Sequence, residues 1–219
     1  MEMLSAMQPS KGNRKPSGGY PSRRAFLGVC AGLTGLTACR VEGYGSDAWR
    51  ERWVLLDADP RGVPISLAEF VDTGTSAGMV EQGVIRRTPA EWKELLSGRQ
   101  YEIVRGKGTE FAFTGEYNKV YEPGLYRCIA CGTALFSSDT KFDSGTGWPS
   151  FWTPIAPENV KTEEDRSLGL PRTEVLCARC DGHLGHVFMD GPPPTNLRYC
   201  LNSAALAFIS RAEPQDARD

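Results

Sequence analysis

Hydrophobic and polar positions first follow a helical period shortly after residue 88. Thr88-Pro89-Ala90-Glu91 combines a capping residue, a proline suited to the first turn and an acid that completes a capping box. Trp92, Leu95 and Leu96 then fall on one helical face, and Ser97-Gly98 is a stop signal. We therefore expect a helix from residue 89 that ends at this signal.

Beyond this helix the pattern changes from helical to alternating. A second short helix is expected over residues 99–105, and after Gly106 glycines, prolines and aromatic residues separate short alternating runs. Such runs are typical of strands in an antiparallel sheet. The expected strands cover residues 124–128, 134–136, 173–177, 186–188, 198–200 and 205–209. The pattern predicts a mainly β domain of the α+β class.

The N-terminal residues have the pattern of an export signal. Ser22-Arg23-Arg24-Ala25-Phe26-Leu27-Gly28 resembles the twin-arginine signature, and a weakly apolar, glycine-rich run continues to Ala38. Leu36-Thr37-Ala38-Cys39 resembles a lipobox, in which Cys39 becomes the acylated first residue. We expect a chain exported by the twin-arginine route and anchored to a membrane through lipidated Cys39. The alternative is a disordered tail with a chance Arg-Arg pair.

These patterns divide the chain into four parts. Residues 1–38 are interpreted as a signal peptide with lipobox, 39–84 as a tether and partly ordered lead-in, 85–212 as the folded domain and 213–219 as a disordered tail. The lead-in has scattered glycines and no sustained period, so the pattern leaves open whether it packs on the domain.

Composition removes some classes of function. The chain has 219 residues and a formal net charge of -2, which offers no basic patch for a nucleic acid. Hydrophobic residues make up 40% of the chain, and no stretch after residue 40 is long and apolar enough to span a bilayer. One globular domain of ordinary core size is expected.

Four of the seven cysteines form two Cys-x-x-Cys pairs, Cys128/Cys131 and Cys177/Cys180, each followed by a glycine turn. Two such pairs supply the four soft ligands that tetrahedral zinc prefers, so one structural zinc ion per chain is expected. Two disulfides are the first alternative, because export leads to an oxidising compartment. A thioredoxin-like redox pair is the second, and it lacks the strand–helix context of that motif.

Cys200 is then the one cysteine without an assignment. Cys30 and Cys39 lie in the export segment, and the paired cysteines are assigned to the metal. A lone thiol in an otherwise assigned set is a candidate nucleophile. The alternative is a buried core cysteine, which is common in strands.

Several long motifs occur together, in one order, in the C-terminal half. They are Gly115-Glu116-Tyr117, the two cysteine pairs, residues 142–151 around Gly147-Trp148-Pro149, Gly182-His183-Leu184-Gly185-His186-Val187-Phe188, and Arg198-Tyr199-Cys200-Leu201-Asn202-Ser203. In these motifs the chain resembles the type B methionine sulfoxide reductases, which reduce the R epimer of methionine sulfoxide. The resemblance covers about residues 91–208. It implies two antiparallel sheets with a few peripheral helices and zinc at the four paired cysteines.

Sulfoxide reduction sets four requirements for the site. They are a thiolate with a pKa below the free value of about 8.5, a proton donor, a cage for the methyl group and a thiol that clears the sulfenic acid. Cys200 is the expected thiolate, and Arg198 shares its strand face. The resemblance places His183 and His186 in the active site, with His186 expected to donate the proton or to orient the sulfoxide oxygen through water.

The remaining expected residues complete this site. Asp190 is expected to tune the histidine, and Asn202 to hydrogen-bond near the nucleophile. Trp148 is the expected wall of the methyl pocket, with help from Phe151. The alternatives are ordinary core packing for Trp148, and packing or a second metal site for the two histidines.

One position departs from the resemblance. Many members of the family carry a resolving cysteine where this chain has Thr146. A single-cysteine enzyme is therefore expected, with an external reductant that is a thioredoxin-like protein or a small thiol. Two other functions remain open: a zinc-stapled binding module for methionine-rich or oxidised proteins, and a disulfide oxidoreductase.

Overall fold

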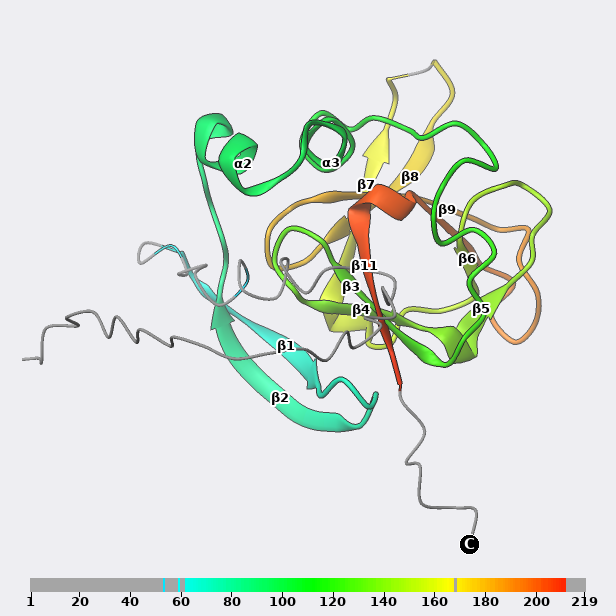
Figure 1. Cartoon of the computed structure of the whole chain (residues 1–219), viewed down its shortest axis with the longest axis horizontal. Coiled ribbons are helices and arrows are strands. Elements are labelled where there is room, and N and C mark those ends of the chain that lie inside the picture. Colours follow the sequence, from blue (N-terminus) through cyan, green and yellow to red (C-terminus); the bar gives the residue numbers. More distant parts are fainter. Residues whose placement is uncertain (1–52, 54–58, 60–61, 168, 212–219) are drawn as a thin grey trace, which may run out of the picture. The chain divides into compact units, whose positions relative to one another are not determined.

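The computed structural model describes residues 53, 59, 62–167 and 169–211 (Figure 1). The expected signal peptide, Cys39 and the C-terminal tail at 213–219 lie outside the described residues. In the described part, no helix has the length and apolar character needed to cross a membrane.

Two short helices begin with capping boxes. In α2 (Pro89–Leu95), the Thr88 side chain accepts a hydrogen bond from the Glu91 N–H, and the Glu91 carboxylate accepts one from the Thr88 N–H. In α3 (Gly98–Val104), Ser97 and Gln100 form the same box. The first helix ends before Ser97-Gly98 as expected, and Ser97 also caps the second helix, which begins one residue before the expected 99–105.

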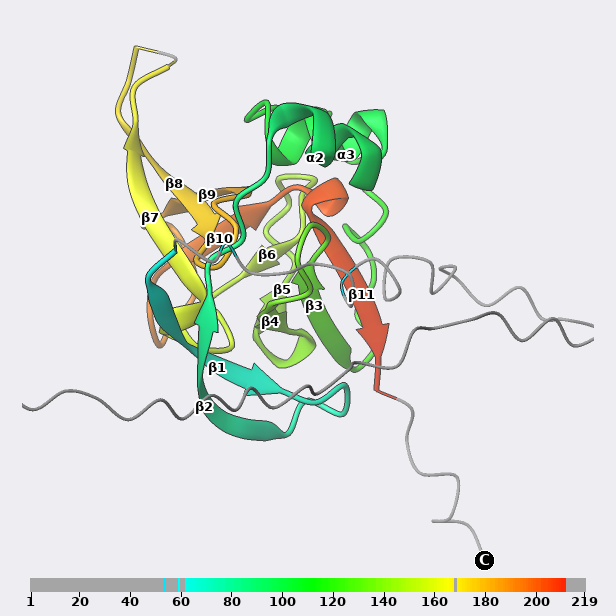
Figure 2. The same cartoon turned by 90° about the vertical axis from the view of Figure 1, so that its left-hand side faces the viewer.

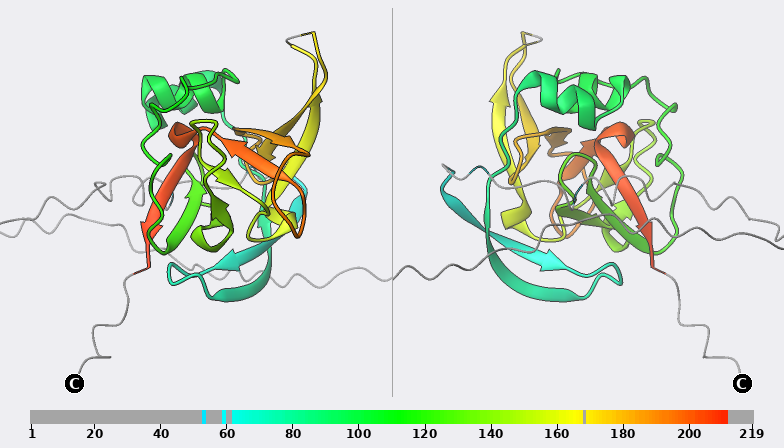
Figure 3. Two further views of the ribbon diagram at one scale, coloured as in Figure 1. Left: turned by 90° about the vertical axis from the view of Figure 1, so that its right-hand side faces the viewer. Right: turned by 60° about the vertical axis from the view of Figure 1, so that its left-hand side comes forward.

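Among the residues that the structure describes, strands form three antiparallel sheets. The largest has the order β5-β6-β10-β9-β8-β7. Its strands are β5 (Lys141–Phe142), β6 (Ser150–Phe151), β7 (Val160–Asp165), β8 (Arg172–Cys177), β9 (His183–Phe188) and β10 (Arg198–Leu201). In both views of Figure 3, β7 and the start of β8 project as a ribbon beyond the neighbouring strands.

A second sheet of three strands has the order β11-β3-β4. Its strands are β3 (Gly124–Cys128), β4 (Ala134–Ser137) and β11 (Leu206–Ser210), and three-residue 3-10 turns lie at Ser138–Thr140, Pro157–Asn159 and Ser203–Ala205. The expected strands are confirmed, and so is the mainly β architecture with two short helices.

The two larger sheets share one aromatic core. Tyr126 of β3, Phe136 of β4 and Phe151 of β6 are fully buried. The Phe151 ring centroid lies 4.7 Å from that of Phe136 and 5.0 Å from that of Tyr126. Because β6 pairs directly with β10, this core fixes the strand that carries Cys200.

The third sheet is a hairpin of β1 (Pro64–Phe70) and β2 (Ser76–Gly83). It contacts the domain, which the sequence pattern left open. Asn159 hydrogen-bonds Ala68 of β1 through both backbone groups, at 2.9 and 2.8 Å. Figure 2 shows α2 and α3 together at one end of the strands, away from β1 and β2.

Candidate active site and metal centre

Strand register brings Cys200 opposite His186. In the β10–β9 ladder Cys200 pairs with His186, and in the β10–β6 ladder it pairs with Ser150. Directly opposed residues of an antiparallel pair project from the same face of the sheet. The expected nucleophile and the expected donor, 14 positions apart in sequence, are therefore neighbours in space.

Cys200 opens into a small pocket. The pocket has a volume of about 130 Å³ and is lined by Thr109, Trp148, Arg172, Gly185, His186, Phe188, Cys200, Leu201 and Asn202. Trp148 is fixed there by a 3.1 Å hydrogen bond from its indole N–H to the Glu110 carbonyl. This volume lies below the usual range of about 300–1,000 Å³ for small-molecule pockets, so the pocket suits the end of one side chain.

The electrostatics of Cys200 differ from the expectation. Burial raises the pKa of the thiol above its ordinary value, while the positive charge of Arg198 and a weak contact with Thr146 lower it. The net direction is upward, opposite to the lowered pKa that is expected of the nucleophile. Arg198 is held by two hydrogen bonds to Asp190, at 2.9 and 2.8 Å, and its guanidinium lies 4.4 Å from the centre of the Phe188 ring.

The carboxylate that contacts His186 belongs to Asp165. The imidazole Nε2 lies 2.8 Å from Asp165 Oδ2, and Arg172 donates to the same oxygen at 2.6 Å. Hydrogen bonds from Ser167, His186 and Arg172 hold the pKa of Asp165 well below its ordinary value. The expectation that Asp190 tunes the histidine is wrong in its contacts, because Asp190 is bound to Arg198 instead.

His183 lies behind the pocket and does not line it. Its Nδ1 is 2.7 Å from Glu174 Oε1, and Glu174 also accepts a hydrogen bond from Lys107 at 2.7 Å. Burial lowers the pKa of His183, and the Glu174 carboxylate opposes this shift. The His183 and His186 rings meet edge to face with centroids 5.4 Å apart. His183 therefore supports the His186 ring from behind.

Of the other two expected residues, Asn202 lines the pocket and Phe151 does not. Asn202 lines the pocket, accepts a hydrogen bond from the Glu110 N–H at 3.0 Å and donates to the Leu184 carbonyl at 3.2 Å. Phe151 is fully buried in the aromatic core and does not line the pocket. The expected role of Phe151 in the methyl pocket is therefore wrong, because its strand turns that side chain toward the core.

Among the residues of the site, Phe188, Arg172 and Asp165 were missed in the sequence. Phe188 lies two positions after His186, and the alternation of a strand would have indicated a shared face. Arg172 and Asp165 pair across the β7–β8 ladder. The β7 run Val160–Asp165 has one apolar residue in six, so no periodic signal marks it as a strand.

Thr146 occupies the place next to the nucleophile. Its hydroxyl oxygen lies 4.0 Å from the Cys200 sulfur and 2.8 Å from the Ser144 hydroxyl. A side chain at position 146 is therefore close enough to act on Cys200, and here that side chain carries no thiol.

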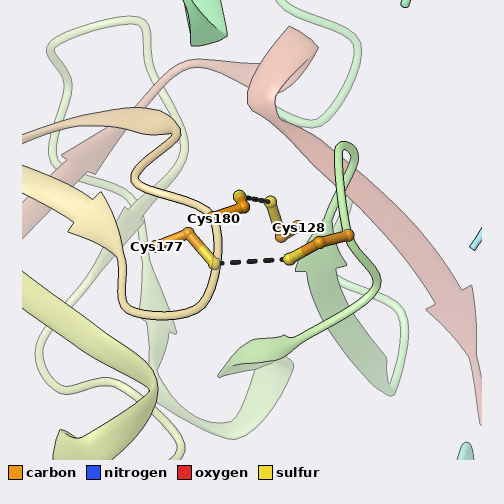
Figure 4. Close-up of side chains that lie close together, drawn as sticks. Cys128, Cys177 and Cys180 are labelled. Atoms are coloured by element: carbon orange, nitrogen blue, oxygen red, sulfur yellow. Dashed lines mark hydrogen bonds between the residues drawn. The ribbon is translucent and has the colours of Figure 1, made fainter. Parts of the chain in front are cut away.

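The two Cys-x-x-Cys turns come together in a buried cluster. All four sulfurs lie within 4.8 Å of one another, with 3.7 Å between Cys128 and Cys180 and 3.5 Å between Cys131 and Cys177. Figure 4 shows Cys128 on one turn facing Cys177 and Cys180 on the other. Each turn is closed by a backbone hydrogen bond from four residues later. The Gly132 N–H donates to the Cys128 carbonyl, and the Asp181 N–H donates to the Cys177 carbonyl.

These distances fit a metal site. Four thiolates about 2.3 Å from a central zinc ion would be about 3.8 Å from one another, whereas a disulfide needs about 2.05 Å. The described cysteines are all free, so the alternative of two disulfides is not seen in the described part. Gly132 and Asp181 both have positive φ, 78° and 57°, so in the second turn aspartate takes the position that glycine takes in the first.

Comparison with known proteins places this arrangement in a family. The model of the SelR domain matches residues 96–210. A peptide methionine sulfoxide reductase MsrB of Herminiimonas arsenicoxydans is 55% identical over 122 residues, which cover 56% of this chain and 89% of that protein. The MsrB of Thiobacillus denitrificans is 58% identical over 122 residues, 56% of this chain and 92% of the relative. The MsrB of Pseudomonas syringae pv. syringae is 54% identical over 128 residues, which cover 58% of this chain and 98% of that protein.

Proposed function

Because the chain belongs to the family of the peptide methionine sulfoxide reductases MsrB, we propose that it reduces the R epimer of methionine sulfoxide in peptides to methionine. The observation that carries the proposal is that Cys200 lines the small pocket together with Trp148, Phe188 and His186. A thiol, an apolar cage and an imidazole are the groups that sulfoxide reduction requires.

The first step forms a bond between the Cys200 sulfur and the sulfoxide sulfur. The sulfoxide oxygen takes up a proton and passes to the Cys200 sulfur as the substrate S–O bond and the new sulfur–sulfur bond break. Cys200 becomes a sulfenic acid, and the substrate sulfur keeps the electron pair and leaves as methionine. Cys200 is oxidised by two electrons and the substrate is reduced by two. His186 is the proposed proton donor, because it lines the pocket opposite Cys200.

Arg198 and Asn202 support this step. Arg198 stabilises the thiolate as substrate enters, and Asp190 holds the guanidinium in place. Asn202 joins the pocket to the segment after Thr109 through its hydrogen bond from Glu110. Trp148 and Phe188 present flat apolar faces to the S-methyl group, where sulfur–aromatic contacts are favourable.

An external thiol completes the cycle. A first thiol attacks the sulfenic acid, releases water and leaves a mixed disulfide, and a second thiol releases Cys200 and forms the reductant's own disulfide. A thioredoxin-like protein or a small thiol is proposed, because position 146, whose side chain lies 4.0 Å from the Cys200 sulfur, is a threonine and not a cysteine. The buried cluster is proposed to hold one structural zinc ion through Cys128, Cys131, Cys177 and Cys180.

The proposed place of action is outside the cytoplasm. The twin-arginine and lipobox patterns support export of the chain and a membrane anchor on Cys39. Fractionation of cells that carry Cys39→Ser tests the anchor. Release of the variant into the soluble fraction is expected, and an unchanged membrane association would contradict it.

Turnover on separated epimers tests the activity. With dithiothreitol as reductant, the protein should reduce the R epimer of a methionine sulfoxide peptide and leave the S epimer unchanged. Cys200→Ser should abolish turnover and retain the metal, which separates an enzyme from a metal-stapled binding module. Reduction of the S epimer alone would overturn the proposal.

A further inference from the structure

A carboxylate reaches across the sheet to His186. Asp165 ends β7, yet its side chain passes over β8 and meets the imidazole on β9 at 2.8 Å. Its Oδ1 accepts from the Ser167 N–H at 2.9 Å, and its Oδ2 is shared by His186 and Arg172. Both oxygens are therefore occupied, and the carboxylate is fixed from three directions.

The ionised carboxylate determines which nitrogen of His186 carries a hydrogen. A carboxylate can only accept, so Nε2 must donate to Asp165. Among the described residues Nδ1 has no hydrogen-bond partner, and His186 lines the pocket beside Cys200. When the ring takes up a second proton, Nδ1 is thus the nitrogen that carries it and can give it to a ligand.

Of the charged and titratable groups around His186, Asp165 is the one that hydrogen-bonds its ring. They come from β7 (Asp165), β8 (Arg172 and Glu174), β9 (His183) and β10 (Cys200). Glu174 is bound to His183 and Lys107, and Arg172 is bound to Asp165. We propose that Asp165 is a positioning residue that fixes the orientation and tautomer of His186 for proton transfer, with Arg172 as its brace. This rests on the proposed function.

Asp165→Asn is the direct test. The amide keeps the size of the side chain but no longer requires a donor at Nε2. We expect kcat to fall about tenfold or more, a part of the about 10²–10⁴ that a general acid contributes. KM should change little, because Asp165 does not line the pocket. Asp165→Glu keeps the charge and should recover part of kcat.

Nitrogen-15 NMR of the imidazole rings reads the tautomer without any turnover. His183 and His186 are the only histidines, and His183 bound to Glu174 serves as an internal reference. In the neutral ring, wild-type His186 should carry its hydrogen on Nε2, and Asp165→Asn should shift it toward Nδ1. Asp139→Asn is the matched control, since it removes a carboxylate from Arg211.

The outcomes separate the two proposals. An unchanged His186 tautomer together with an unchanged kcat in Asp165→Asn would overturn the role of Asp165. If wild-type protein reduced neither epimer, the proposed function would fail, while the NMR result would still report the Asp165–His186 pairing.

A second inference comes from an independent set of contacts, between the N-terminal segment and the metal cluster. The Trp53 indole donates to the Ile129 carbonyl, between Cys128 and Cys131, at 3.0 Å. Its ring also lies so close to Gly132 that a Cβ there would be 2.7 Å from it. The first cysteine turn is therefore covered by Trp53.

The second cysteine turn is tied to the same segment. The Ile85 N–H donates to the Arg179 carbonyl at 2.8 Å, and the Arg179 side chain donates to the Gly83 carbonyl at 3.4 Å. Beside the first turn, Arg127 forms an ion pair with Asp72 at 3.1 Å. These contacts lie within two residues of the cluster cysteines, and this segment precedes the SelR match at residues 96–210.

We propose that Trp53 and residues 62–85 act as a strap that holds the two cysteine turns together and slows loss of the metal. The test is the rate at which a coloured chelator takes zinc from the full chain, a readout independent of activity. Trp53→Ala and Arg179→Ala should each release zinc several-fold faster than wild type.

Met79→Ala is the control, because Met79 lies on the same hairpin with its side chain 55% exposed. It should release zinc at the wild-type rate. Wild-type rates in both Trp53→Ala and Arg179→Ala would overturn the strap, and far-UV circular dichroism shows that each variant is folded before the measurement.

Discussion

At the scale of single residues, Arg198 offsets the burial of Cys200. The buried thiol has a raised pKa, and the guanidinium works against that shift. Arg198→Met should move the thiol pKa further up, so the acidic limb of the rate profile moves to higher pH. At pH 7 the rate should fall about tenfold for each unit of pKa, because the thiolate fraction falls by that factor. Rate measurements from pH 5 to 10 check this.

Two further variants bracket this prediction. Arg198→Lys keeps the charge and should move the profile less than Arg198→Met. Asp190→Asn removes an anion that raises the thiol pKa, so its direct effect on the profile is toward lower pH. An acid shift of the profile in Arg198→Met would be incompatible with the assigned role of Arg198.

The threonine beside the nucleophile leads to a gain-of-function prediction. Thr146 lies 4.0 Å from the Cys200 sulfur, so Thr146→Cys should place a thiol within reach of the sulfenic acid. One equivalent of substrate should then yield an internal disulfide between residues 146 and 200, seen by mass spectrometry as the loss of two hydrogens. Thr146→Ser is the control and should accumulate the sulfenic acid. Failure of Thr146→Cys to form the bond would contradict the geometry.

Much of the site follows from sequence because its residues lie close together along the chain. Cys200, Arg198 and Asn202 belong to one strand and its end, and His186 precedes Phe188 on the next. Asp165 could not be found in this way, because a side chain that crosses a strand leaves no trace in local spacing. Asp190, the carboxylate close to His186 in sequence, is bound to Arg198 instead.

At the scale of elements, the burial of a strand decides whether its sequence predicts it. Runs with several buried positions, such as Arg172–Cys177, are visible as strands. β2 and β7 are mostly exposed or half-buried and carry no alternation of apolar and polar side chains, and β1 alternates only over Ile65-Ser66-Leu67. Their backbone pairing is determined by neighbouring strands rather than by their own pattern.

The packing of β6 separates stability from substrate binding. Phe151 of β6 is fully buried between Tyr126 and Phe136, whereas Trp148 lines the pocket. Phe151→Leu should lower the free energy of unfolding by about 1–3 kcal/mol, because it opens space in a close-packed core, and it should leave KM nearly unchanged. Trp148→Leu should raise KM and leave the free energy of unfolding nearly unchanged. Denaturant midpoints and KM values check both, and a raised KM with normal stability in Phe151→Leu would return Phe151 to the pocket.

At the scale of the whole molecule, the four cysteines connect the two larger sheets. One turn joins β3 to β4 in the three-stranded sheet, and the other joins β8 to β9 in the six-stranded sheet. A bound ion would therefore join chain segments that are 46 positions apart at Cys131 and Cys177. Without the ion, four buried sulfurs remain side by side with no ligand to hold them together.

Removal of the metal should therefore unfold the domain rather than only weaken it. Structural zinc contributes roughly 10–16 kcal/mol in small zinc-finger peptides, which is comparable to the about 5–15 kcal/mol of net stability of an ordinary domain. Chelation should abolish the near-UV circular dichroism of the buried aromatic core, and stoichiometric zinc should restore it. Cys128→Ser should behave like the chelated protein, whereas Cys200→Ser should retain about one zinc per chain and a normal unfolding midpoint, because Cys200 lies outside the cluster. A chelated protein with an unchanged midpoint would show that the two sheets hold together through the aromatic core alone.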